Sequence, residues 1–179
     1  MRLHLHHIAI LVRSVEATET TLPPCLGRLP VETFPGEGTK EQYLDLDPAG
    51  RTSLLLIEAM GEGPYRQTFS KRGPGLHHFG CMTNNLEEAV DHFGSQRLFL
   101  HPISQRTLKQ NVAWMCRPGI PFLLEIVETP NLDSTAGPLL GISIPRLDAA
   151  LPVHLPRLTM SPTDDDFVTI TTDALSFQL

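Results

Sequence analysis

Two histidines and one glutamate stand out because each lies inside a short apolar run of the chain. His7 and His78 are each the second histidine of a pair, in the runs LHHIAI and LHHFGC, and Glu125 lies in the middle of FLLEIV. Neutral imidazoles and a carboxylate are ordinary ligands of zinc, cobalt, nickel, manganese and iron. The three side chains are therefore the candidate ligands of one divalent metal ion.

The surroundings of Glu125 strengthen this interpretation. A run that is apolar on both sides of the glutamate predicts a buried strand. An ionised carboxylate that is buried without a partner costs several kcal/mol, or its pKa shifts until the group is neutral. Something must compensate the charge of Glu125, and a metal ion is one answer.

An internal repeat organises the elements that would position these residues. The aliphatic residue that opens a helix lies eight positions after the second histidine in both copies, at Val15 and Leu86. A fainter third copy begins with LLGISI and has Gly141 where the histidine stood. Each copy reads as a strand, a helix and three further strands.

These are the expected elements. The first copy predicts strands over 3–12, 29–34, 41–47 and 53–59 with a helix over 15–22; the second, strands over 76–83, 97–101, 111–116 and 121–128 with a helix over 86–94; the third, strands over 139–144, 157–160, 166–171 and 174–179 with a helix from about 147.

Strand alternation separates the two histidines of each pair. Successive side chains of a strand point to opposite faces, so His7 and His78 share faces with small neighbours such as Ala9 and Gly80. We expect this face to be concave, with room for a ligand. On the same count His6 and His77 lie on the opposite face, where we expect them to cover helix edges.

The expected fold class is α+β. Paired βαβββ modules, 1–62 and 63–130, would form a curved, barrel-like mixed sheet with helices outside, and a degenerate third βαβββ-like module would follow over 131–179. Four strands with unpaired edges are a poor stopping point, so the third module is a possible dimerisation element that would give a homodimer.

Composition narrows the choice of partners. The 179 residues carry 14 Lys and Arg against 20 Asp and Glu, a net charge of −6, which argues against a nucleic-acid partner and favours a small-molecule substrate. No apolar run has the roughly 18 residues that a membrane helix needs, and the N-terminus has no apolar signal core. We expect a cytoplasmic protein that does not bind a membrane.

Several motifs together resemble a known family. The strand starts LHHIAI and GLHHFG, the approach FSKRGPGLHH and the ending PFLLEIVE are similar to the vicinal oxygen chelate superfamily (glyoxalase, bleomycin resistance, extradiol dioxygenase), and most like its methylmalonyl-CoA-epimerase-like branch. The resemblance covers roughly residues 3–129. It implies a metal held by a histidine of the first strand, a Glu or Gln late in the first module, the matching second histidine and a Glu of the last strand. Those positions are His7, approximately Leu55, His78 and Glu125.

Leu55 departs from the family pattern, because leucine cannot bind a metal. Glu58 lies three residues further on, on the opposite strand face, and could replace the missing ligand only through a register slip or a bulge. Without it the site has two histidines and one carboxylate, which also describes the facial triad of non-haem iron oxygenases.

The resemblance also implies an acid/base residue on the strand over 41–47. Glu41 and Gln42 are the candidates for moving a proton beside a carbonyl, with Asp45 on the same strand, and solvated edge residues are the alternative reading. Glu125 could also leave the metal during that step.

Three functions remain open at this point. The leading one is a metal-dependent isomerase, epimerase or lyase that acts on a small carbonyl or acyl-thioester substrate through a metal-stabilised enolate. The second is an Fe(II) extradiol-type dioxygenase with the same ligands. The third is a non-catalytic, drug-sequestering binding protein in which the three ligands are relics.

Overall fold

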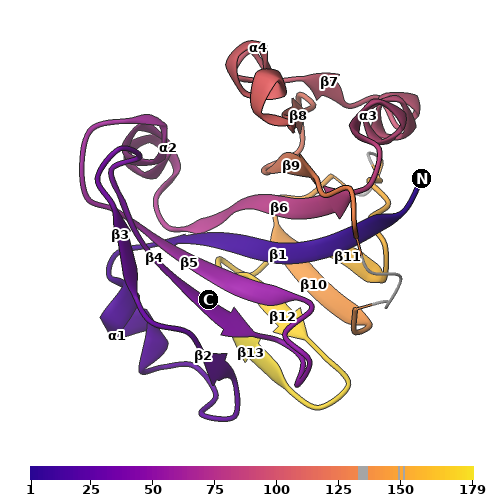
Figure 1. Cartoon of the computed structure of the whole chain (residues 1–179). Coiled ribbons are helices and arrows are strands. Elements are labelled where there is room, and N and C mark those ends of the chain that lie inside the picture. Colours follow the sequence, from indigo (N-terminus) through magenta and orange to yellow (C-terminus); the bar gives the residue numbers. More distant parts are fainter. Residues whose placement is uncertain (133–136, 149, 151) are drawn as a thin grey trace.

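The chain forms one large and one small sheet with short helices (Figure 1). The computed structural model describes residues 1–132, 137–148, 150 and 152–179. The elements are β1 (Leu3–Val12), α1 (Val15–Glu19), β2 (Gly27–Arg28), β3 (Glu32–Phe34), β4 (Thr39–Asp45), β5 (Ser53–Ala59), α2 (Pro64–Arg72), β6 (Gly75–Thr83), α3 (Leu86–Ser95), β7 (Phe99–Leu100), α4 (Ser104–Thr107), a 3-10 turn (Leu108–Gln110), β8 (Val112–Cys116), β9 (Leu123–Glu128), β10 (Leu140–Pro145), β11 (Leu158–Thr163), β12 (Thr169–Thr171) and β13 (Ser176–Gln178).

The large sheet joins the two predicted modules edge to edge. Its strand order is β2-β4-β5-β1-β6-β9-β8-β7, with β3 also paired to β4. Within each module the first strand pairs in parallel with the last, β1 with β5 and β6 with β9. The antiparallel pair β1·β6 connects the modules at the centre. The predicted α+β class with paired βαβββ modules is confirmed, as a curved sheet that does not close into a barrel.

Local sequence signals begin both module helices. The Ser14 hydroxyl accepts a hydrogen bond from the Ala17 N–H at the start of α1, and the Asn85 side chain accepts one from the Glu88 N–H at the start of α3. The helix α2 was not expected from the sequence. It begins with Pro64 in its first turn, a position where the missing N–H of proline costs nothing.

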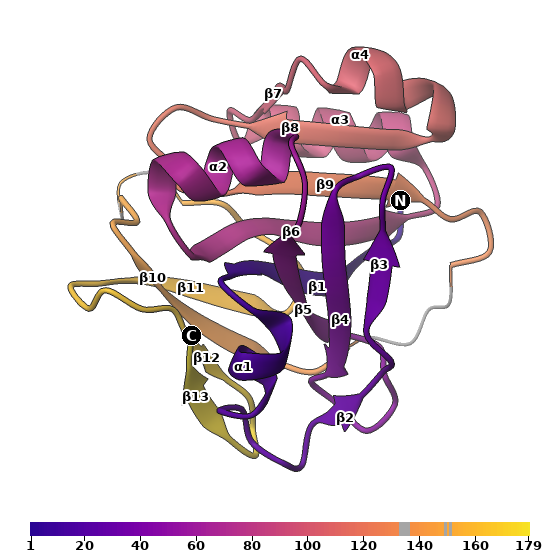
Figure 2. The ribbon, with the colours of Figure 1, turned by 90° about the vertical axis from the view of Figure 1, so that its left-hand side faces the viewer.

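The small sheet packs on the outer face of the large sheet, the face that also carries α1 and α3. Its strand order is β11-β10-β12-β13, and Figure 2 shows it beside α1, beneath β1 and β6. Ile142 of β10 and Ile170 of β12 belong to the same buried cluster as Ile8 of β1 and Phe79 of β6. This cluster is the main hydrophobic core.

The third copy keeps its predicted strands but not its predicted helix. None of the described residues among 147–156 is helical, although 149 and 151 lie outside the described residues. Pro152 and Pro156 fall in this stretch, and proline in a helix interior removes a hydrogen bond and clashes with the preceding turn. The strand order also differs, because β10 lies inside its sheet between β11 and β12. The division of the chain at 62 and 130 and the dimer through the third module stay predictions.

None of the helices in the described part of the chain has both the length and the apolar character needed to cross a membrane.

A buried aspartate fixes the connection from β4 to β5. The Asp47 carboxylate accepts hydrogen bonds from the backbone N–H groups of Ala49, Arg51 and Thr52 and from the Arg51 guanidinium. The Thr52 hydroxyl in turn donates to the Leu5 carbonyl of β1 at 2.9 Å. Burial by itself raises the pKa of Asp47, but these N–H donors lower it below its ordinary value of 3.8.

We expect Asp47→Ala to lower the free energy of unfolding by about 2–3 kcal/mol at neutral pH, because buried N–H groups lose a charged acceptor. The folded-state pKa is depressed, so the electrostatic part of this stabilisation is present above pH 3.8 and is lost as the pH falls through the lower folded value. Urea unfolding at pH 7 and near pH 3 measures both. Asp164→Ala, in an exposed turn, is the control. Equal losses for the two variants would contradict this role.

Candidate metal centre

Two β-bulges, one in each central strand, shape the candidate site. Leu5 lies opposite Cys81 but His7 lies opposite Gly80, so β1 carries one extra residue at His6. Bulges interrupt the alternation of side chains and re-aim them, and they are frequent beside functional sites.

The second bulge is in β6. Ala9 lies opposite His78 while Ile10 lies opposite Leu76, so the extra residue is His77. In both modules the bulge therefore falls on the first histidine of the His-His pair.

Three donor atoms converge on the inner face of the large sheet, the face opposite the main core. The Nε2 atoms of His7 and His78 lie 2.9 Å apart. Glu125 Oε2 lies 3.6 Å from His7 Nε2 and 3.9 Å from His78 Nε2. A triangle of this size can place all three atoms about 2.0–2.2 Å from one central ion, the usual length of zinc bonds to imidazole and carboxylate. The three residues form the one such cluster of possible metal ligands found among the described residues.

Gly80 makes the convergence possible. It lies opposite His7 on one side and opposite Glu125 on the other, so the three residues are level across β1, β6 and β9. A Cβ atom added to Gly80 would overlap the imidazole ring of His7. The ring therefore lies over the backbone of β6, where it reaches His78.

Burial shifts the pKa values of all three candidate ligands toward their neutral forms. It lowers the pKa of His7 to about 3, with the neighbouring His6 adding to the shift, and it holds the pKa of His78 well below its usual value. Both imidazoles are then neutral at physiological pH. Burial also raises the pKa of Glu125 to about 7, helped by the charges of Glu37 and Glu41. The contacts between Glu125 and the histidines are therefore not ion pairs, and the carboxylate has no charged partner among the described side chains.

The histidine that precedes each candidate histidine ligand contacts its ring. His6 Nδ1 lies 2.9 Å from His7 Nδ1, and His77 Nδ1 lies 2.8 Å from His78 Nδ1. A histidine that presents the lone pair of Nε2 to a metal carries its proton on Nδ1, which must donate to an acceptor. The expectation that His6 and His77 lie on the opposite face from His7 and His78 is therefore wrong, because the bulges turn both side chains toward the His7 and His78 rings. His77 does contact a helix, through Tyr65 of α2.

Aromatic and apolar side chains surround the site. The ring centroid of Trp114 lies 5.0 Å from that of His78, and the centroid of Tyr65 of α2 lies 4.9 Å from that of His77. Tyr43 lies 5.9 Å from His7 on the same measure. A second apolar cluster on this face consists of Ala9, Leu11, Leu55 and Ile57 with Tyr43, Tyr65 and Phe69 against it.

The fourth family position holds no ligand. Leu55 is 3% exposed within the apolar cluster. The carboxylate of Glu58 accepts a hydrogen bond from the Val15 N–H at the start of α1 and lies 3.3 Å from the Lys40 ammonium, on the outer face. Glu58 therefore does not replace the missing ligand, and the site is a set of two histidines and one carboxylate.

The two acid/base candidates of β4 separate. Glu41 faces the inner side, where its carboxylate accepts from the Thr39 hydroxyl at 2.7 Å, and burial raises its pKa. No hydrogen bond joins Glu41 to the three converging residues among those described. Gln42 faces the outer side and donates to the Leu29 carbonyl, so the structure does not bring it to the site. Asp45 lies level with His7 through Ser53 of β5, and its carboxylate accepts a hydrogen bond from the Ser53 hydroxyl.

The sequence argument missed the neighbours of the ligands. His6, His77, Tyr43, Tyr65 and Trp114 all contact the site, yet strict strand alternation left the first two on the other face. The sequence did contain a signal for His6 and His77, because both copies have two consecutive histidines. One histidine per copy is enough for a metal ligand, so the repeated second histidine indicates a further role at the site.

Comparisons with known proteins agree with the fold and the repeat. A family model of the glyoxalase/bleomycin resistance protein/dioxygenase superfamily matches residues 6–105. No protein curated for its function gives a significant match.

Solved structures share the two-module fold. A hypothetical protein from Bacillus halodurans is 22% identical, with a TM-score of 0.57 over 75% of this chain and 100% of that one. Methylmalonyl-CoA epimerase from Mycobacterium tuberculosis is 21% identical, with a TM-score of 0.52 over 70% of this chain and 87% of that one. A methylmalonyl-CoA epimerase in complex with methylmalonyl-CoA and NH4+ is 17% identical, with a TM-score of 0.54 over 75% and 100%.

The family model spans more than half of the chain, and the paired modules of the sheet agree with it. The chain belongs to the glyoxalase/bleomycin resistance protein/dioxygenase superfamily.

Proposed function

We propose that this protein is a metal-dependent isomerase, epimerase or lyase that acts on a small carbonyl or acyl-thioester substrate. The observation that carries the proposal is the convergence of His7, His78 and Glu125 within 3.9 Å on a buried, partly apolar face. A bound divalent ion supplies a Lewis acid for a carbonyl oxygen. Three protein ligands leave coordination positions open for a substrate.

The other residues of the site would bind, orient and exclude water. His6 and His77 fix the rings of His7 and His78 through their Nδ1 atoms. The apolar cluster around Leu55 and Ile57 keeps water from the inner side of the ligands. A site of this kind strengthens the interaction of a reacting group with fixed charges.

Glu41 is the proposed acid/base residue. It lies on the same face of the sheet as the ligands, and burial raises its pKa toward the range in which a carboxyl can both accept and return a proton. Its charge also contributes to the raised pKa of Glu125, after burial and the charge of Glu37. Glu41 would take a proton from the carbon beside the substrate carbonyl and return it.

An acyl thioester is the first substrate to test. Support comes from the similar solved structures, several of which are methylmalonyl-CoA epimerases, one of them in complex with methylmalonyl-CoA.

A second candidate, an Fe(II) extradiol-type dioxygenase, is supported by Leu55. Because leucine cannot bind a metal, the possible ligands are two histidines and one carboxylate, which is the ligand set of the non-haem iron facial triad. Oxygen consumption by the iron-loaded protein across a panel of catechols would favour this candidate, and proton exchange without oxygen uptake would favour the isomerase.

Metal content is the first of three predictions about the proposed function. We expect about one equivalent of a divalent ion per chain after incubation with zinc, cobalt, nickel, manganese or iron, measured by elemental analysis. His7→Ala and Glu125→Ala should each lose it, because each removes one of three ligands. His92→Ala, on the exposed side of α3, is the matched control and should keep it. Absence of metal from the unsubstituted protein with every ion would instead favour a binding protein with a decayed site.

The supporting histidines give a second prediction. His77→Phe should weaken metal binding by roughly 10–100-fold, because loss of an outer hydrogen-bond partner usually has that effect. His77→Asn should restore part of the affinity, since its amide oxygen can accept from His78 Nδ1. Isothermal titration with Zn²⁺ measures both variants. If the His77→Phe and His77→Asn variants bind the ion as tightly as the unsubstituted protein, the 2.8 Å contact between the Nδ1 atoms of His77 and His78 has no positioning role.

Glu41 gives a third prediction. Glu41→Gln should keep the metal but slow hydrogen–deuterium exchange at the carbon beside the thioester of methylmalonyl-CoA by roughly 10²–10⁴-fold, the usual contribution of a general base. Proton NMR in D2O measures the rate. Glu87→Gln, at an exposed position of α3, is the control. An unchanged rate in Glu41→Gln would exclude Glu41 as the base.

A further inference from the structure

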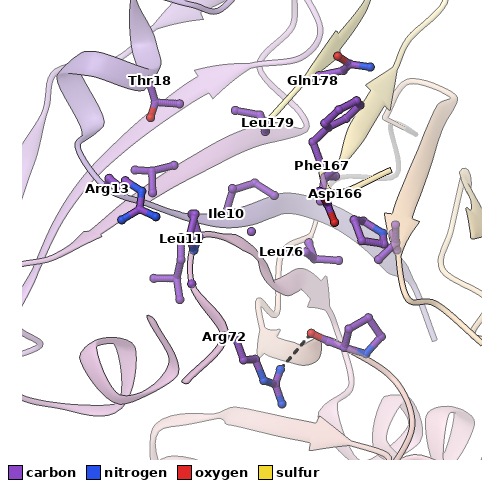
Figure 3. A pocket seen from close by; sticks show the side chains of 18 of the residues that line it. Ile10, Leu11, Arg13, Thr18, Arg72, Leu76, Asp166, Phe167, Gln178 and Leu179 are labelled. Atoms are coloured by element: carbon purple, nitrogen blue, oxygen red, sulfur yellow. Dashed lines mark hydrogen bonds between the residues drawn. The ribbon is translucent and has the colours of Figure 1, made fainter. Parts of the chain in front are cut away.

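A cavity lies where the large sheet meets the small sheet (Figure 3). Its volume is about 900 Å³. The wall comes from the end of β1, the start of α1, the end of α2 with the link to β6, and residues of the small sheet. None of the three candidate metal ligands lines it, so this cavity is separate from the metal centre.

The interior of the cavity is apolar. Ile10 and Leu76 come from the two central strands, and Ile144, Phe167 and Leu179 come from the third part of the chain. Figure 3 shows Ile10, Leu76 and Phe167 among the side chains that line the cavity. Apolar walls with a few polar groups are typical of sites that bind small organic molecules, and such sites commonly enclose 300–1,000 Å³.

Four cationic side chains surround this interior. They are Arg13, Lys71, Arg72 and Arg146, and Asp166 is the one acidic side chain among the described residues of the lining. No carboxylate of the described residues forms an ion pair with any of the four cations. Arg72 donates to the Pro121 carbonyl at 3.1 Å, and the Arg13 guanidinium lies 5.9 Å from the Phe69 ring centroid.

This concentration of cations runs against the charge of the whole molecule, whose net charge is −6. Clustered cations at a concave, partly apolar surface raise the local concentration of anions and bind them through charge-assisted hydrogen bonds. An inorganic ion alone would fit this cavity poorly, because it would make no contact with the apolar walls.

We propose that this cavity binds a small amphipathic anion, an apolar chain or ring that ends in a carboxylate or a phosphate. The apolar part would lie against Leu76, Ile144 and Phe167, and the anionic group would meet Arg13 and Arg146, with Lys71 and Arg72 adding to the positive potential of the cavity. The small sheet supplies one whole wall, so the site exists only because the chain continues beyond the two modules. The inference is independent of the proposed metal chemistry.

The test uses decanoate and decyl phosphate as probes and 1-decanol as their neutral counterpart, each titrated calorimetrically into the full chain. We expect one saturable site for an anionic probe, at least about tenfold tighter than for the alcohol, which is a difference of roughly 1.4 kcal/mol. Added salt should weaken anion binding and leave alcohol binding unchanged. The better of the two anions identifies the head group, carboxylate or phosphate.

Variants locate the site. The double substitution Arg13→Gln with Arg146→Gln should weaken the anionic probe by about tenfold or more, as expected for the loss of charge-assisted contacts. The matched double substitution Arg106→Gln with Lys109→Gln changes the net charge equally at exposed positions outside the cavity and should have no effect. Phe167→Ser should weaken the anion and the alcohol alike.

Three results would overturn the proposal. One is no saturable binding of either anion by the folded protein. Another is equal affinity in the Arg13/Arg146 and Arg106/Lys109 double variants. The last is loss of binding in His7→Ala with full binding in the Arg13/Arg146 double variant, because the anion would then occupy the metal centre.

Discussion

The antiparallel pairing of β1 with β6 is the constraint on which the rest of the structure depends. It joins the two modules, and its register places His7 opposite Gly80 and Ala9 opposite His78. Because Gly80 has no side chain, the His7 ring can lie across the strand and bring its Nε2 within 2.9 Å of the other ligand. A slip by one residue would turn both ligands to the main core, so the packing of the outer face and the geometry of the inner face are specified by the same register.

Bringing two imidazoles and a carboxylate together in a buried place costs free energy when no cation lies between them. Two imidazoles and a carboxylate lose their hydration, and burial moves the pKa of His7 to about 3 and that of Glu125 to about 7. The bulges at His6 and His77 add interruptions to the central ladder. Departures of this kind from local preference are expected where a fold maintains a functional site, and the cores on both faces must compensate them.

The sequence predicted the features that depend on repetition and missed those that depend on tertiary contact. The repeat located His7 and His78 and gave the two-module sheet, and the apolar run around a single carboxylate located Glu125. Strand alternation failed at the bulges because a register shift between two strands is not visible in either strand alone. The role of Glu58 at the start of α1, and the absence of a helix in the described residues after β10, follow from neighbours that are distant in the sequence.

The small sheet buries apolar side chains on the outer face of the large sheet. In the large sheet α1 and α3 lie on the outer face of separate modules, and the central strands between them present Ile8 and Phe79, both fully buried here. Strands β10 and β12 complete that core with Ile142 and Ile170. Leaving such side chains in water would cost about 25 cal/mol per Å² of apolar surface. The third part of the chain therefore covers the apolar outer face, which would otherwise need a partner subunit to bury it. The cavity lies where the edge of the small sheet meets the ends of β1 and β6.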